Sequence, residues 1–338
     1  MSRDLLFYSG RKQSVVRWLP FEGYGKRFVA VTGSWDDEDG CSTLAAWSFD
    51  SGSSPTQAMG EGSHSGGVTG IALGASSTTS VQVVTSSDRG CVAAFKLSLS
   101  ADGERVEILP QWSNPAAHAG GATASVVTFP QDSAVAASAG EDGRLVVMSA
   151  LSGQPLRAIR AAEDTVSCLA ATGACTLASG GRSAVLWDLR DLHSTSQLTL
   201  GDADGAGNFT AVAFDPTGTL VAAGSSCSRL SIWDVRKGNT TLCNVQVPHK
   251  TTPIWELAFP PTAARSMLLS VSADGRLLQW DFASSVYTAD NFQASQLNAV
   301  RVLADRTLSA NSLDPHPTEN QVVVVSDDDS IQLASYQV

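Results

Sequence analysis

The chain has 338 residues, of which 43% are hydrophobic and 16% charged, and this composition excludes a disordered protein. The formal net charge is −11 and no basic run occurs, so we expect no direct contact with nucleic acid. No apolar run approaches the roughly 18 residues that a membrane span needs, and charges interrupt the first twenty positions (Arg3, Asp4, Arg11, Lys12 and Arg17). The sequence therefore predicts no membrane insertion and no ordinary secretory signal.

Cysteine and histidine residues show no spacing typical of a metal site. The cysteines never form C-x-x-C, which favours reduced thiols in a cytosolic or nuclear protein. His193 and His316 fall in polar turns, where we expect exposed side chains. The glycine-rich segment 60–67 has no following Lys or helix, so it predicts a loop and not a phosphate-binding site. We expect no metal, no cofactor and no catalytic residue.

Similar apolar runs recur along the chain and end at Trp47, Phe95, Met148, Trp187, Trp233, Trp280 and Ala334. Their spacing of 39 to 54 residues lies near the roughly 40–45 residues of one WD-repeat blade. Three of the runs end in Trp-Asp, and Gly, Asp or Ser residues separate short β-rich segments within each unit. The pattern predicts an all-β, seven-bladed WD-repeat propeller.

The predicted strands follow in chain order, three or four to a unit. They cover 14–19, 28–34 and 42–49; 68–73, 81–86, 91–97 and 105–109; 124–129, 134–139, 144–150 and 156–160; 165–170, 176–180, 184–189 and 197–200; 209–214, 220–224, 229–235 and 242–247; 254–259, 268–272, 277–281 and about 298–303; 308–313, 322–326 and 330–336. We expect one domain, 1–338, with blades at about 11–61, 62–113, 114–161, 162–202, 203–248, 249–304 and 305–338 plus 4–9.

The last unit has only three predicted strands, while the first apolar run of the chain, Leu5–Tyr8, has no partner in the first unit. Pairing this run as the outer strand of the last blade closes the ring and leaves only short, protected edges. We therefore expect the N-terminal strand to complete the last blade.

Two sets of side chains resemble the hydrogen-bonded network of a WD-repeat blade. His249, Ser270, Asp274 and Trp280 form a complete tetrad in the sixth unit, and His118, Ser138 and Asp142 form a partial one in the third unit. A Ser-His-Asp set also permits a hydrolase. The Asp stands in a turn, however, and the set recurs in eroded form, so we predict a structural network that links the strands of each blade.

Tandem W-D-x-R sequences end the third strands of two adjacent units, with Asp188 and Arg190 in one and Asp234 and Arg236 in the next. Such pairs resemble the motif through which WD-repeat substrate receptors contact the adaptor of cullin-four ubiquitin ligases. The same Asp and Arg can instead pair with each other on one strand. Acidic runs at 36–39 and 327–329 can bind a cation or a basic peptide, although solvated turns are the simpler interpretation.

The divergent segments TGSWD at 32–36, GEDGR at 140–144, LSIWDVRKG at 230–238 and LSANSLD at 308–314 stand in a characteristic order. In this order the chain resembles the family of nucleoporin forty-three, small WD-repeat propellers in the Y-shaped outer-ring (coat) subcomplex of the nuclear pore. The resemblance covers nearly the whole chain. It is looser from 150 to 207, and the connection 283–297 is shorter than the family usually carries.

The resemblance implies a non-enzymatic scaffold subunit at the nuclear pore complex in the nuclear envelope. Such a subunit supports pore assembly and the transport of protein and mRNA. It implies a hetero-oligomer with other outer-ring nucleoporins, chiefly an α-helical solenoid nucleoporin in the short arm of the Y. The alternatives are a substrate receptor of a cullin-four ubiquitin ligase and a peptide-binding propeller that recognises a basic tail.

Overall fold

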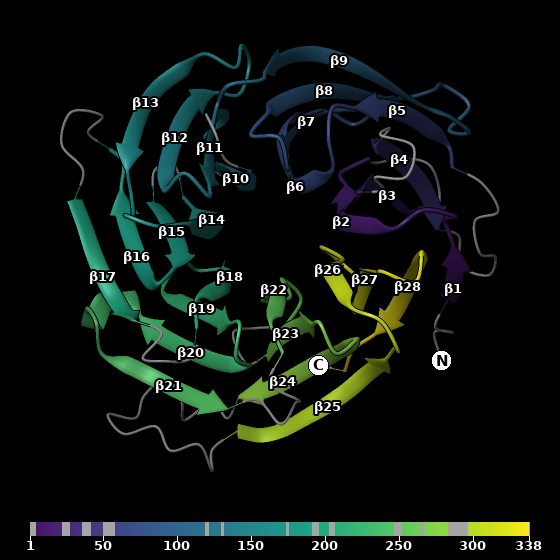
Figure 1. Ribbon diagram of the computed structural model, residues 1–338. Helices are drawn as coiled ribbons and strands as arrows, with labels where there is room; N and C mark the ends of the chain where they lie inside the picture. The colour runs from purple at the N-terminus through teal and green to yellow at the C-terminus, as the bar shows by residue number, and fades with distance from the viewer. Residues whose placement is uncertain are drawn as a thin grey trace.

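Seven four-stranded antiparallel sheets surround a central channel in the part of the chain described by the computed structural model (Figure 1). The described residues are 5–21, 28–35, 42–49, 58–118, 122–129, 132–173, 176–190, 196–202, 207–246, 252–263, 267–282 and 297–337. The predicted all-β, seven-bladed propeller is confirmed.

The strands of each blade run from the channel outward in chain order, except in blade 7. Blade 1 holds β2 (Gln13–Leu19), β3 (Phe28–Ser34), β4 (Ser42–Phe49) and β5 (Gly60–His64); blade 2 holds β6 (Val68–Ser76), β7 (Ser80–Ser87), β8 (Val92–Leu99) and β9 (Val106–Asn114); blade 3 holds β10 (Thr123–Phe129), β11 (Asp132–Gly140), β12 (Arg144–Ser149) and β13 (Pro155–Arg160). Blade 4 holds β14 (Val166–Thr172), β15 (Thr176–Gly181), β16 (Ser183–Asp188) and β17 (Ser196–Asp202); blade 5 holds β18 (Phe209–Phe214), β19 (Leu220–Ser225), β20 (Arg229–Asp234), the 3₁₀ turn η1 (Val235–Lys237) and β21 (Thr241–Gln246). Blade 6 holds β22 (Ile254–Ala258), β23 (Met267–Ser272), β24 (Arg276–Phe282) and β25 (Leu297–Asp305); blade 7 holds β26 (Ala310–Pro315), β27 (Gln321–Ser326), β28 (Ser330–Ser335) and β1 (Leu5–Tyr8).

The antiparallel order gives the propeller two distinct faces. The linkers between blades and the turns between second and third strands lie on one face, here called the upper face. The other connections lie on the opposite, lower face. Loops of both kinds are where a propeller presents its binding surfaces.

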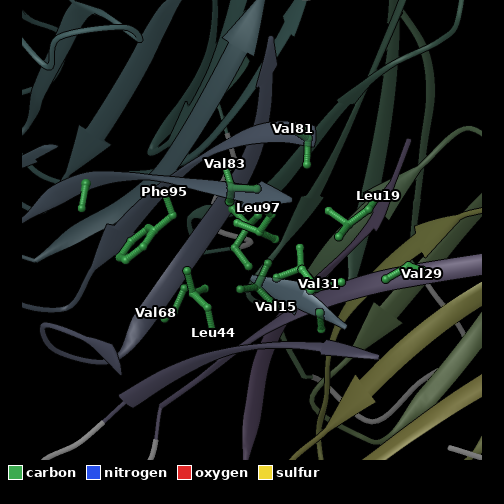
Figure 2. Close-up of a cluster of buried hydrophobic side chains, with 14 of the residues drawn as sticks. Val15, Leu19, Val29, Val31, Leu44, Val68, Val81, Val83, Phe95 and Leu97 are labelled. Carbon is green, nitrogen blue, oxygen red and sulfur yellow. The ribbon is translucent and has the colours of Figure 1, made fainter. Parts of the chain in front are cut away.

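The hydrophobic core lies between neighbouring blades. The middle strands are buried on both faces, as in β19, because each blade is sandwiched between two others. Figure 2 shows the cluster between blades 1 and 2, where Val15 and Leu44 of blade 1 meet Val68, Val83 and Phe95 of blade 2. The same apolar side chains therefore join neighbouring blades as well as the strands within each blade.

Each inner strand carries a β-bulge at its second residue, where the pairing with the next strand skips one position. Five of the seven bulged residues have a short polar side chain: Ser14, Thr69, Ser167, Thr210 and Asn311. Four of these donate a hydrogen bond to the carbonyl of the first inner-strand residue of the next blade, namely Ser14 to Val68, Thr69 to Thr123, Thr210 to Ile254 and Asn311 to Gln13. These four bulges therefore connect blade 1 to 2, blade 2 to 3, blade 5 to 6 and blade 7 to 1 beside the channel.

Trp255 occupies the bulge position in blade 6 and departs from this pattern. Its indole Nε1 donates to the Ser309 hydroxyl at 3.0 Å, just before β26, and 42% of the residue is exposed. Blade 6 is therefore joined to blade 7 by a larger side chain than the other blades use.

The N-terminal strand closes the ring as predicted. In Figure 1, purple β1 lies beside yellow β28 at the edge of blade 7. Leu5 is opposite Leu333, and Phe7 is opposite Ile331. Phe7 also packs against Trp47 and Phe49 of blade 1, with ring centroids 5.3 and 5.8 Å apart, so the closing strand contacts both sides of the seam.

Segment 60–67 is not the loop that its glycines predict. Gly60–His64 forms β5, the outer strand of blade 1, and the Met59 carbonyl accepts a hydrogen bond from the Val106 amide of β9. A Cβ on Gly60 would lie 1.8 Å from the Val106 carbonyl oxygen. The glycine thus allows two outer strands to approach closely, which periodicity in the sequence does not reveal.

Replacing Phe7 with Ala should lower the free energy of unfolding by about 3 kcal/mol, because it removes a buried aromatic side chain from the closing seam. The matched control is Leu6→Ala, at a half-exposed neighbour on the opposite face of β1, which should cost less than about 1 kcal/mol. Urea denaturation of both variants measures the difference. Equal losses would contradict the role of β1 in closure.

Candidate functional sites in the blades and the channel

His118, Ser138 and Asp142 meet in blade 3 as the sequence predicts. His118 Nδ1 lies 2.9 Å from Asp142 Oδ1, and His118 Nε2 lies 2.9 Å from the Ser138 hydroxyl oxygen. The Asp142 carboxylate also accepts from the Arg144 amide at 3.1 Å, which fixes the turn after β11. The network connects the linker before the blade, its second strand and its upper turn.

The order Asp–His–Ser is that of a hydrolytic triad, but its burial prevents that use. Ser138 is fully buried and the His118 side chain has no exposed surface. A nucleophile must be within reach of a substrate carbonyl. This triad therefore acts as a hydrogen-bonded structural connection.

The blade 6 tetrad is described in part, because His249 lies outside the described residues. Trp280 Nε1 donates to the Ser270 hydroxyl at 2.9 Å. Asp274 Oδ1 accepts from the Ser272 hydroxyl at 2.5 Å and from the Arg276 amide at 3.2 Å. These contacts hold the turn in which Gly275 has a φ of 84°. The pairing of His249 with Ser270 and Asp274 stays a prediction.

A hydroxyl recurs at the position of Ser270 in other blades. In each case it stands on the second strand, two residues after the residue that pairs with the Trp, or with Phe95 in blade 2. Trp47 Nε1 donates to Thr32 at 2.9 Å, and Trp187 Nε1 donates to Ser179 at 2.8 Å. In blade 2, His64 Nε2 lies 2.9 Å from the Thr85 hydroxyl. These pairs were not predicted, although a Ser or Thr near the end of the strand before each Trp or Phe strand was the signal that could have found them.

Blade 7 makes the equivalent connection with different chemistry. Arg306 donates to the Asp328 carboxylate at 2.5 Å, and its backbone amide donates to the Gly275 carbonyl. The His118 amide likewise donates to Gly90, in the turn of the blade before it. Arg306 thus stands where a linker histidine stands in blade 3. A search for histidine could not find this substitution.

Blade 5 has the Trp without the hydroxyl. Ala223 occupies the position of Ser270, and Trp233 Nε1 has no hydrogen-bond partner among the described residues although Trp233 is buried. An unsatisfied buried N–H costs about 1–3 kcal/mol.

The Asp that ends each W-D-x-R strand pairs with the Arg two residues beyond it, on the lower face. Arg236 Nε lies 2.8 Å from Asp234 Oδ1, and Arg190 Nε lies 2.8 Å from Asp188 Oδ2. The hydrogen bonds from Arg190 lower the pKa of Asp188, and those from Arg236 lower the pKa of Asp234. The Arg190 and Arg236 side chains remain 78% and 58% exposed.

The acidic turn 327–329 makes internal contacts. Asp327 accepts from the Asn311 side-chain amide at 2.7 Å, and Asp328 accepts from Arg306 and from the hydroxyl of Ser330. These bonds favour a structural role over the binding of a cation. The other acidic run, at 36–39, lies outside the described residues.

Charged residues from three blades meet on the wall of the channel. Arg17 of β2 donates to Glu256 Oε1 of β22 at 2.6 Å, and Glu256 Oε2 accepts from the Ser312 hydroxyl of β26 at 2.6 Å. The Asp314 carboxylate accepts from the Trp18 amide at 2.7 Å. This cluster was not predicted from the sequence, since Arg17 and Glu256 are 239 positions apart.

The protein around Asp314 disfavours its charge. Burial raises the pKa of Asp314 to about 7, against the opposing attraction of Arg17 and the hydrogen bond from Trp18. Burial disfavours the charge on Arg17 as well, but Glu256 and Asp314 more than offset this and raise the pKa of Arg17. The cluster joins blades 6, 7 and 1 beside the closing seam.

The two remaining histidines have different outcomes. His193 lies outside the described residues. His316 is buried against Trp18 and Phe28, with ring centroids 5.1 and 4.1 Å away, so the prediction of an exposed side chain is wrong. His316 Nδ1 accepts from the Glu319 amide at 3.1 Å, which explains how a histidine fits in a polar turn and still faces the core.

Within the described part of the chain, no group of three or more His, Cys, Asp or Glu residues is placed to hold a metal ion. None of the described helices is long and apolar enough to cross a membrane.

The model of the WD domain, G-beta repeat matches residues 195–234. This match and the seven blades define the chain as a WD-repeat β-propeller. Within that class its sequence is similar to nucleoporin Nup43, which confirms the resemblance found in the divergent segments: the human protein is 26% identical over 300 residues, covering 82% of this chain and 76% of Nup43. Mouse Nup43 is 26% identical over 295 residues, covering 81% of this chain and 74% of the mouse protein.

A third relative shows that other WD-repeat proteins share part of this sequence. The target of rapamycin complex subunit wat1 of Schizosaccharomyces pombe is 29% identical over 167 residues, covering 48% of this chain and 50% of that protein. The Nup43-like similarity extends over much more of the chain than this one.

Replacing Ala223 with Ser should raise the free energy of unfolding by about 1 kcal/mol, because the new hydroxyl can accept the hydrogen bond that Trp233 Nε1 lacks. The control is the same change in a Trp233→Phe background, where no N–H exists to be satisfied. Urea denaturation measures both pairs. An equal effect of Ala223→Ser in the two backgrounds would refute the explanation.

Replacing Asp314 with Asn should change how stability depends on pH. Because the folded pKa of about 7 lies above the unfolded value, Asp314 contributes stability that is present at low pH and is lost as pH rises through 7. The asparagine side chain would keep the acceptor for the Trp18 amide but would not titrate. The free energy of unfolding of the variant, relative to that of the parent, should therefore rise by about 1–3 kcal/mol between pH 5 and pH 8. This range allows for screening by water in the channel. Urea denaturation at both pH values measures this, and an equal effect of the substitution on the free energy of unfolding at pH 5 and pH 8 would contradict it.

Proposed function

We propose that this protein is a non-enzymatic scaffold subunit of the outer ring of the nuclear pore complex. In this role it lies at the nuclear envelope and supports pore assembly and the transport of protein and mRNA. The observation that carries the proposal is the similarity to Nup43, which extends over 82% of the chain and so well beyond a single repeat. A propeller fold alone would not support it, because that fold serves many functions.

The chemistry of the buried groups agrees with a scaffold. The Ser138 hydroxyl is enclosed within blade 3, and burial raises the pKa of the Cys168 thiol to about 12. Neither group is available as a nucleophile at neutral pH. The polar side chains that most resemble a catalytic site are used to hold strands together.

The partner in this proposal is an α-helical solenoid nucleoporin of the short arm of the Y-shaped subcomplex. A rigid ring suits such contacts, because a preorganised surface loses little conformational entropy on binding. The bulge hydrogen bonds and the channel cluster supply that rigidity, since both connect side chains of different blades.

A second candidate is a substrate receptor of a cullin-four ubiquitin ligase. It is favoured by the exposed guanidinium groups of Arg190 and Arg236, which stand at equivalent positions on the lower face of adjacent blades. Their pairing with Asp188 and Asp234 holds each guanidinium in a fixed direction. A structural role of these ion pairs explains the same geometry without a partner.

Affinity purification of a tagged full-length chain from its own cells, followed by mass spectrometry, tests the proposal. Outer-ring nucleoporins should be recovered, and a fluorescent fusion should mark the nuclear rim. A diffuse fusion and no recovered nucleoporin would reject the scaffold function.

The double variant Arg190→Glu/Arg236→Glu separates the two candidates. It reverses two exposed charges on the lower face and should leave the recovery of nucleoporins unchanged. Loss of a cullin adaptor from the purified material, with nucleoporins absent from the parent sample, would favour the ligase receptor instead.

A further inference from the structure

A cavity of about 270 Å³ opens on the upper face between blades 3 and 4. One wall is the linker 161–165, and the other is formed by the upper ends of β15, β16 and β17. Ser179 and Gly181 lie among its lining residues, with Glu163, Asp164 and Arg182 also contributing. Neither the buried network of blade 3 nor the channel accounts for it.

The walls of this cavity match the surroundings of His118 in blade 3. Ser179 faces Val185 across its strand pair as Ser138 faces Val146, and Gly181 pairs with the first inner-strand residue as Gly140 does. In blade 3 the imidazole ring lies against that glycine, since a Cβ on Gly140 would be 2.7 Å from His118 Nδ1. Blade 4 has the same glycine and the same hydroxyl.

The imidazole itself is missing from blade 4. The His118 amide donates to the carbonyl of Gly90, and the amides of Ala161 and Ala162 make the same bond to Gly143. One of these alanines therefore stands at the position of the histidine. The three atoms nearest to a Cβ built on Gly181 belong to the backbone of Thr165 and Val166, whereas two of the three nearest to a Cβ on Gly140 belong to the His118 ring.

The upper turn of blade 4 is also shortened. Only Arg182 separates β15 from β16, so no aspartate corresponds to Asp142 of blade 3. Blade 7 fills the equivalent region with Arg306, which pairs with Asp328. Blade 4 thus retains the hydroxyl, the glycine and the Trp of this network, but it lacks the histidine and the aspartate that cover them in blade 3.

The chemistry of the cavity specifies what fits. The Ser179 oxygen accepts from Trp187 Nε1 at 2.8 Å, which leaves the hydroxyl proton to be donated to another group. A hydroxyl bound in this way offers its proton to a ring nitrogen. The carboxylates of Glu163 and Asp164 at the rim can accept an N–H from the other side of the ring. A neutral imidazole supplies one acceptor and one donor at opposite positions.

We propose that this cavity is a receptor site for an imidazole ring, presented by a histidine side chain of a partner polypeptide. The ring replaces the histidine that blade 4 lacks: it packs on Gly181, accepts the Ser179 proton and donates to a rim carboxylate. The volume suits this, because an engineered cavity of about 150 Å³ already holds a benzene molecule in another protein. The site is independent of the assembly to which the protein belongs.

Titration with imidazole and with N-acetyl-histidine methylamide at about pH 8, where a histidine ring is neutral, tests the proposal. The readout is the indole N–H resonance of Trp187 in the full-length protein, assigned with Trp187→Phe. Both probes should shift this resonance saturably. Of the variants Ala161→His and Ala162→His, the one that restores the internal imidazole should raise the melting temperature and abolish the response.

His118→Ala is the matched control, because it creates the same vacancy in blade 3. Imidazole should restore part of the melting temperature that this variant loses. Such a rescue would show that free imidazole can bind in the space left by a missing histidine ring in this fold. Rescue of blade 3 without any response of Trp187 in the parent protein would overturn the proposal. Equal shifts of Trp187 with benzene would also overturn it, because a plain apolar void would then explain binding.

Discussion

A hydrogen bond from the bulged second residue of an inner strand to the backbone of the next blade, seen in four blades among the described residues, is the contact on which the rest of the propeller depends. The bulge turns a short polar side chain out of its own sheet, so that it can reach the backbone of the next blade. Blades are therefore joined by directional hydrogen bonds at the channel and by apolar packing further out. Packing alone would permit neighbouring sheets to slide, whereas a bond to one particular carbonyl fixes their register.

Hydrogen bonding within the blades varies most at the upper position, where the linker meets the turn between the second and third strands. The upper position holds His118 with Asp142 in blade 3, Arg306 with Asp328 in blade 7, and alanines in the linker before blade 4. All four strands remain paired in each of these blades. The position of the buried Trp is kept in blade 4 by Trp187 and is taken by Met148 in blade 3 and Ala334 in blade 7. The network therefore adds to a blade that the core already stabilises, which explains why its members can be lost one at a time.

Much of the architecture could be predicted because its signals are local and repeated. The spacing of the Trp-like positions, the Asp-Gly turns and the missing last strand indicate seven blades and their closure by β1. The triad at His118 also follows from a fixed spacing. In contrast, Arg17, Glu256 and Asp314 come together only when the ring is closed, and their sequence separation hides them. Other features escape prediction because an unexpected residue type stands at the position. Arg306 takes the place of a histidine, and the glycines of β5 are typical of a loop.

The pairing of β1 with β28 has a consequence for biosynthesis. The two partners are the first and last strands of the ring, so the first one leaves the ribosome long before its partner exists. At about 5–20 residues per second, the interval amounts to tens of seconds. During that time the apolar face of Phe7 is exposed and blade 7 is absent, so the nascent chain presents an unpaired strand to solvent. Closure of the ring must therefore wait until β28, the last strand of blade 7, has been synthesised.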